Sequence, residues 1–140
     1  MPRAILAAAT FAMALAAATP ALGLTCRGYP SAAVHLAETD LVFRGTVIAV
    51  VERTGRFEPE TLTTFEINKV YKGTPRAQTV TVAQTLSSIG REYQVGMSDI
   101  VFAHEAEGNF WTSACEGPHF PWPDYLRALR SGAVHRGPRG

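Results

Sequence analysis

The first hydrophobic feature of the chain is an almost unbroken apolar run near its beginning. Residues 4–20, AILAAATFAMALAAATP, carry no charge and follow a single arginine. Small residues at Ala21 and Gly23 then form the A-x-G pattern that signal peptidase recognises. We expect residues 1–23 to be a signal peptide cut after Gly23, with cleavage after Ala21 as the alternative. A retained membrane anchor fits less well, because a proline ends the run.

Alternation of apolar and polar side chains predicts five β-strands after this leader. The predicted strands are residues 40–52, 61–73, 78–86, 99–106 and 109–116. Gly45 interrupts the first strand, which is typical of a bulge or a sharp coil. In the third strand Val80 and Val82 alternate with threonines. The Glu-Gly pair at 107–108 predicts a hairpin between the last two strands.

Two short helices flank the predicted strands. Ser31 is a favourable N-cap for a helix in the sequence SAAVHLAET. A second, amphipathic helix should begin at about Pro123 and turn Tyr125 inward. The last residues, 132–140, offer nothing to bury, so we expect them to form a disordered tail.

The length and the spacing of these elements together predict the fold class. Removal of the leader leaves 117 residues (140 − 23), enough for one domain with a core. Five strands within about ninety residues suit a small closed barrel, because closure removes exposed strand edges. We therefore expect a mainly β fold: a five-stranded closed Greek-key, OB-fold-like barrel with a short N-terminal helix and a C-terminal helix. The domain should span residues 24–131.

The net charge of the chain limits the kinds of partner that it is expected to bind. Without the arginine of the leader, the 13 Lys and Arg become 12, against 12 Asp and Glu, so the mature chain has no net formal charge. The basic residues form no stripe along the sequence. Nucleic acid and anionic membranes are therefore not expected as partners of the mature form.

Cysteine usage fits an exported protein. Cys26 and Cys115 are the two cysteines of the chain, and 89 positions separate them (115 − 26). Exported compartments are oxidising, so an even count favours a disulfide between the two. Two free, separately buried thiols are the alternative.

Histidine and serine positions give no catalytic arrangement. The four histidines, His35, His104, His119 and His135, lack a metal-binding spacing such as H-x-x-x-H. His35 and Glu38 could share a helix face, where such a pair is usually solvated. Ser113 lacks the G-x-S-x-G elbow of a nucleophilic serine. We therefore expect a binding protein rather than an enzyme, with no catalytic residue, no bound metal and no cofactor.

Several stretches taken together resemble one protein family. They are LTCRGYP, DLVFRGTV, FEINKVYKG, SSIGREY and NFWTSACEGPHFPW, in this order between residues 24 and 126. In order and spacing they are similar to the N-terminal domain of tissue inhibitors of metalloproteinases and to bacterial secreted proteins of that netrin-like, OB-fold group. The most specific pieces are TTFEINKVYKG and the cysteine-containing hairpin followed by proline and tryptophan.

The resemblance implies a way of binding a protease. Family inhibitors begin with Cys-x-Cys, and the α-amine and carbonyl of the first residue chelate the protease zinc, which keeps an open coordination position. Carried over, Leu24 takes the chelating position, Thr25 the pocket position and Cys26 the second cysteine. Cys115 then matches the cysteine that pairs with Cys26. The SSIGRE loop, with Ser88 and Ile89, would make a secondary contact.

The sequence departs from the family at one cysteine pair. The first family cysteine is Leu24 here, and its partner matches Ile89. Because both members are apolar, we expect a packed pair in place of a covalent one, with Leu24 and Ile89 close in space. Without that bridge the α-amine is held less rigidly, which weakens its chelation of zinc. Cleavage after Ala21 would extend the terminus and block it.

Two functions follow from these observations. The first is a secreted, monomeric, metalloprotease inhibitor-like protein that binds a secreted zinc protease through Leu24, Thr25 and Cys26. The second is a non-inhibitory adhesion or envelope module on the same barrel. Both place the protein outside the cytoplasm, in the periplasm or beyond the cell, and the sequence does not separate these two locations.

Overall fold

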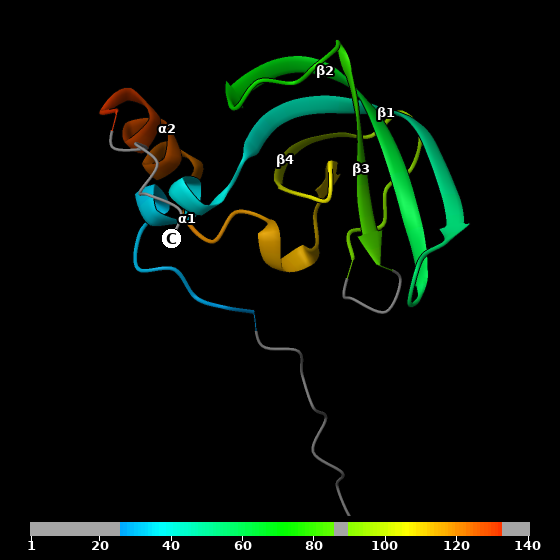
Figure 1. Ribbon diagram of the computed structural model, residues 1–140. Coiled ribbons are helices and arrows are strands. Elements are labelled where there is room, and N and C mark those ends of the chain that lie inside the picture. The colour runs from blue at the N-terminus through cyan, green and yellow to red at the C-terminus, as the bar shows by residue number, and fades with distance from the viewer. Residues whose placement is uncertain (1–25, 86–89, 133–140) are drawn as a thin grey trace, which may run out of the picture.

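The computed structural model describes residues 26–85 and 90–132, so the predicted leader and nearly all of the predicted tail lie outside the described residues. In chain order the elements are α1 (Ala32–Glu38), β1 (Leu41–Thr54), β2 (Pro59–Lys72), β3 (Thr79–Thr85), β4 (Ser98–Ala106), β5 (Asn109–Trp111), the 3-10 helix η1 (Ala114–Glu116) and α2 (Trp122–Arg130). Figure 1 shows the two α-helices side by side at one side of a strongly curved sheet.

Each of the five strands is paired with two others. β1 pairs antiparallel with β2 and with β4, β2 pairs with β3, and β4 pairs with β5. β3 and β5 run parallel and are joined by the pairs Val82–Phe110 and Ala83–Trp111. The order β1-β2-β3-β5-β4 therefore returns to β1 and closes the sheet on itself. The mainly β fold with five strands and two flanking α-helices is confirmed.

β1 is long and curved because its pairing with β2 is irregular. Register shifts lie between Val42 and Phe43, between Arg44 and Gly45, and between Val47 and Ala49. A Cβ at Gly45 would lie 2.8 Å from Cε2 of Phe43 and 3.0 Å from Cβ of Phe65. Glycine is needed here because any side chain would meet these core rings. The irregularity predicted at Gly45 is confirmed.

Two clusters of buried apolar residues lie on opposite faces of the sheet. The inner cluster consists of Leu41, Phe43, Val47, Phe65, Val80, Val82, Tyr93, Val101 and Ala103. The outer cluster joins the helices to β1 and β4 through Ala32, Leu36, Val42, Phe102, Tyr125 and Ala128. Alternation along a strand explains both, because successive side chains such as Phe102 and Ala103 point to opposite faces.

Each helix is fixed at its ends as well as along its buried face. The Ser31 hydroxyl accepts a hydrogen bond from the Val34 N–H at 3.3 Å, which confirms the predicted N-cap of α1. The Lys72 ammonium donates to the carbonyls of Leu36 and Thr39 at the other end of α1. In α2 the predicted inward residue, Tyr125, is fully buried.

The last predicted strand is shorter in the structure than the sequence suggests. Glu107 and Gly108 have positive φ values of 53° and 76°, as expected for the two central residues of a hairpin turn of the primed type. β5 then ends at Trp111, and the prediction of a strand through 116 is wrong. The Ser113 hydroxyl instead accepts the Cys115 N–H at 3.2 Å and caps η1.

Candidate functional site

The residues predicted to contact a protease fall mainly outside the described part of the chain. Leu24 and Thr25 precede it, and Ser88 and Ile89 lie in the gap after β3. The predicted proximity of Leu24 and Ile89 therefore concerns residues outside the described part of the chain. The structure describes the positions next to them, which are Cys26 on one side and Thr85 and Gly90 on the other.

A disulfide between Cys26 and Cys115 confirms the predicted pairing. The two Cα atoms lie 5.2 Å apart and are separated by 89 positions in sequence. Cys26 is exposed and Cys115 belongs to η1. The bond therefore attaches the segment before α1 to the segment that follows β5.

Hydrogen bonds around η1 place this disulfide beside the end of β3. The backbone N–H of Thr112 donates to the carbonyl of Ala83 at 2.9 Å, and its hydroxyl donates to the carbonyl of Phe102 at 2.7 Å. Thr112 is buried, so these bonds are protected from water. β3 ends two residues after Ala83, at Thr85. The segment that carries Cys115 and the last residues of β3 thus leave the sheet at the same end, here called the disulfide end.

A column of stacked side chains holds the segment that follows Cys26. The Arg27 guanidinium lies 5.6 Å from the centroid of the Tyr29 ring. Tyr29 stacks on His35 at 4.3 Å between centroids, and His35 stacks on Phe102 of β4 at 5.0 Å. Arg27 also pairs with Glu38 of α1 at 3.1 Å. The chain next to the disulfide is therefore fixed to the outer face of the sheet by ring contacts.

His35, at the centre of this column, is fully buried, so the predicted solvated pair with Glu38 is wrong. α1 turns Ala32, His35 and Leu36 toward the sheet and leaves Glu38 outside. Nδ1 of His35 lies 2.7 Å from the Tyr125 hydroxyl, which accepts the His119 N–H at 2.9 Å and so has its hydrogen available for His35. Burial and the neighbouring His119 lower the pKa of His35 to about 4.

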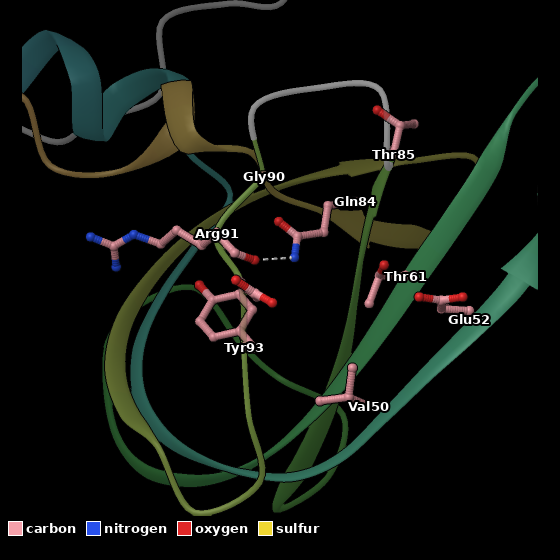
Figure 2. Close-up of a pocket in the computed structure, with 9 residues that line it drawn as sticks. Val50, Glu52, Thr61, Gln84, Thr85, Gly90, Arg91 and Tyr93 are labelled. Atoms are coloured by element: carbon pink, nitrogen blue, oxygen red, sulfur yellow. Dashed lines mark hydrogen bonds between the residues drawn. The ribbon is translucent and has the colours of Figure 1, made fainter.

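A cavity of about 420 Å³ opens next to the end of β3. Its lining residues are Val50, Glu52, Thr61, Gln84, Thr85, Gly90, Arg91, Glu92 and Tyr93. Glu52, Thr61 and Gln84 are paired across β1, β2 and β3, so their side chains form one row on the same face. Figure 2 shows the Gln84 amide directed at Arg91, where its Nε2 donates to the Arg91 carbonyl at 2.7 Å.

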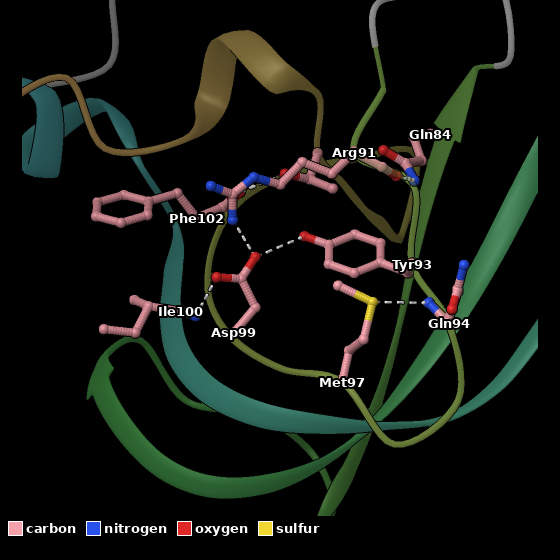
Figure 3. Close-up of polar contacts among 9 residues, drawn as sticks. Gln84, Arg91, Tyr93, Gln94, Met97, Asp99, Ile100 and Phe102 are labelled. Carbon is pink, nitrogen blue, oxygen red and sulfur yellow. Dashed lines mark hydrogen bonds and ion pairs between the residues drawn. The ribbon is translucent and has the colours of Figure 1, made fainter.

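The wall of this cavity is fixed by a polar network. The Arg91 guanidinium donates to the Asp99 carboxylate, and the Tyr93 hydroxyl donates to the same oxygen at 3.4 Å (Figure 3). The other Asp99 oxygen accepts the Ile100 N–H at 2.8 Å. Burial, with the nearby Asp99 charge, raises the pKa of Tyr93 to about 12. Residues 91–93 are thereby attached to β4, and the Arg91 charge is neutralised.

A second cavity, of about 390 Å³, lies against the disulfide itself. Arg27, Tyr29, Glu38, His104, Cys115 and Glu116 line it. His104 is half-exposed, with Nδ1 3.7 Å from a Glu116 carboxylate oxygen. Within residues 26–85 and 90–132, no group of three or more His, Cys, Asp or Glu side chains is arranged to hold a metal ion. In the same ranges, no helix has the length and apolar character needed to cross a membrane.

Sequence reasoning missed the stacked column and the cavity beside Gln84. Both depend on contacts between residues far apart in the chain. In the column, for example, His35 stacks between Tyr29 and Phe102. One weak signal was available for the column, since Tyr29 and His35 both follow Cys26 within ten residues. For the cavity, the sequence carries no such signal.

No protein-family model and no curated protein sequence matches this chain. The resemblance to tissue inhibitors of metalloproteinases therefore depends on the sequence motifs alone.

Proposed function

We propose that this chain is an exported, non-catalytic binding domain that contacts a secreted zinc protease with its disulfide end. One observation carries the proposal: the Cys26–Cys115 bond lies beside the end of β3. Leu24 and Thr25 directly precede Cys26, and Ser88 and Ile89 follow β3 within four residues of Thr85. Both proposed contact segments therefore start from the same end of the sheet.

The strand order supports an OB-fold-like Greek-key barrel as the framework of this domain. Neighbouring strands follow the order β4-β1-β2-β3, which is the spatial arrangement of a Greek key. β5 joins β3 to β4 and completes the circuit of five strands expected for an OB fold.

In this proposal the partner's zinc is bound by the main chain of the mature N-terminus. The α-amine of Leu24 and the carbonyl oxygen of the same residue would fill the open coordination positions of a catalytic zinc. Only the unprotonated amine has a lone pair to donate. Thr25 would enter the specificity pocket, and the disulfide at Cys26 would restrict the motion of both residues and so reduce the entropic cost of binding.

N-terminal sequencing of the exported protein is the first test, because it decides whether a free amine exists at Leu24. Residual activity of a panel of secreted zinc proteases is then measured with protein that begins at Leu24. One alanine added before Leu24 should abolish inhibition while the circular dichroism spectrum stays the same. Thr25→Gly should weaken inhibition less, by about tenfold, since it removes a side-chain contact and keeps the amine.

The absence of the family's first cysteine pair favours one alternative, a non-inhibitory adhesion or envelope module. Leu24 and Ile89 stand at those two positions, so no covalent bond fixes the α-amine. If protein beginning at Leu24 inhibits no zinc protease at micromolar concentration, this second function replaces the first.

A further inference from the structure

One margin of the sheet, the outer edge of β1, takes no part in the proposed function. β4 covers this edge only along Leu41–Thr46. The turn before β4 extends the cover by one residue, where the Val47 N–H donates to the Met97 carbonyl and the Gly96 N–H to the Val47 carbonyl, both at 2.8 Å. Among the described residues, the stretch Ile48–Thr54 is paired with β2 alone. In Figure 1 this half of β1 forms the right-hand margin of the sheet.

Exposed apolar side chains are concentrated along this margin. Of eight exposed large hydrophobic residues in the described ranges, six lie here: Val95, Met97, Ile48, Val50, Val51 and Phe57. Val95 and Met97 belong to the turn where the pairing with β4 ends, and Phe57, 90% exposed, lies in the β1–β2 turn at the other end. Exposed apolar side chains grouped in this way mark an interaction surface rather than ordinary scatter.

We propose that this margin is the interface of a symmetric dimer, in which Ile48–Thr54 of two copies pair antiparallel about a twofold axis at Val51. An unpaired strand edge presents a row of N–H and C=O groups that another strand can complete. Val51 is the central residue of the seven, and it is 56% exposed. A twofold axis there pairs the whole free stretch with itself, as an isologous interface requires.

The charges of the stretch are compatible with this register. Glu52 and Arg53 are its two charged residues. The axis at Val51 sets Val50 opposite the partner's Glu52 and Ala49 opposite the partner's Arg53, so no like charges oppose each other. In the form expected after removal of the leader, the 12 Lys and Arg balance the 12 Asp and Glu, so two copies have no net charge repulsion.

The same register accounts for the apolar residues at both ends of the margin. Along the outer edge of β1, β4 pairs with the first part of the strand, and the second copy's strand would pair with the rest. The turn after Thr54 of one copy then reaches the turn before β4 of the other copy, which brings Phe57 toward the partner's Val95 and the partner's Met97. The disulfide end takes no part, so the dimer does not depend on the proposed function. The proposed dimer differs from the monomer expected from the sequence, because the sequence alone does not show which strand edge stays unpaired.

Sedimentation velocity of the exported protein from about 1 to 200 µM tests the dimer, which should form with a dissociation constant in this range. Val51→Lys should raise that constant at least tenfold. Val34→Lys, which changes an exposed valine of α1, is the matched control and should leave it unchanged. A protein that stays monomeric at 200 µM, or a dimer that Val51→Lys does not weaken, would overturn the proposal.

Cysteine cross-linking tests the register. Directly opposed residues of antiparallel strands have Cα atoms about 4.5–5.5 Å apart, within the range of a disulfide. Val51→Cys should therefore give a covalent dimer under mild oxidation, and so should the double variant Ala49→Cys with Arg53→Cys. Ala49→Cys alone should not, since it faces the partner's Arg53. Equal cross-linking of Val51→Cys and Ala49→Cys would show that the strands do not pair about Val51.

Discussion

Acid should destabilise the fold through His35, which is neutral and fully buried in the column between Tyr29 and Phe102. Burial and His119 lower its pKa to about 4, whereas an unfolded histidine titrates near 6.5. The unfolded chain therefore takes up this proton at a higher pH than the native chain does. The contribution of His35 to stability is complete above pH 6.5, falls as the pH drops toward 4, and is constant below that.

The size of the effect follows from the two pKa values. A drop from 6.5 to about 4 corresponds to about 3 kcal/mol in the free energy of unfolding. Urea unfolding followed by tryptophan fluorescence, at several pH values from 7.5 to about 4, measures this quantity. Carboxylates also titrate near pH 4, so the comparison must be made with His35→Gln, whose amide oxygen can still accept from the Tyr125 hydroxyl without titrating.

The difference in stability between the native protein and His35→Gln should change by about 3 kcal/mol across this range. His104→Gln, which removes a half-exposed histidine outside the column, is the control substitution. The ring resonances of His35 in an NMR titration give a second measurement that does not require unfolding. The same pH dependence in the native protein and His35→Gln, or a His35 ring that titrates near 6.5, would refute the reasoning.

Two further predictions concern the disulfide end. Cys115→Ala should lower the free energy of unfolding by about 2–5 kcal/mol, because the disulfide closes a loop of 89 positions. Thermal melts with and without a reductant check this, and unchanged melts would contradict it. Cysteines introduced together at Leu24 and Ile89 should form a second disulfide if those residues are neighbours, with Cα atoms within about 7 Å. Mass spectrometry of the alkylated, non-reduced double variant decides, and two alkylated thiols would show that the residues lie apart.

Strand positions were predictable because their signal is local. Alternation around Val80 and Val82 appears within a few residues, and both side chains are buried in the inner cluster. The glycine break at Gly45 was visible for the same reason. The pairing of Cys26 with Cys115 was predictable from composition and compartment, since two cysteines allow a single intramolecular bond.

The remaining features depend on contacts that sequence periodicity does not carry. His35 was expected in solvent because Glu38 follows it by three residues, yet Phe102 and Tyr125, brought from far along the chain, enclose it. β5 ends early because the chain turns into η1 after Ser113, where Cys115 is bonded to Cys26 from far along the chain. The open margin of β1 likewise follows from where β4 stops pairing, which no local pattern records.

The position of the disulfide also determines what a protease can do to this protein. Cys26 precedes β1 and Cys115 follows β5, so the covalent loop encloses all five strands. A cut in the exposed turn around Phe57 would leave two fragments that remain one molecule, joined through sulfur and held by the pairing of β1 with β2 and with β4. A nicked chain would then release its fragments only after reduction. For a protein proposed to meet proteases outside the cytoplasm, the single bond preserves the binding end after the backbone has been cut.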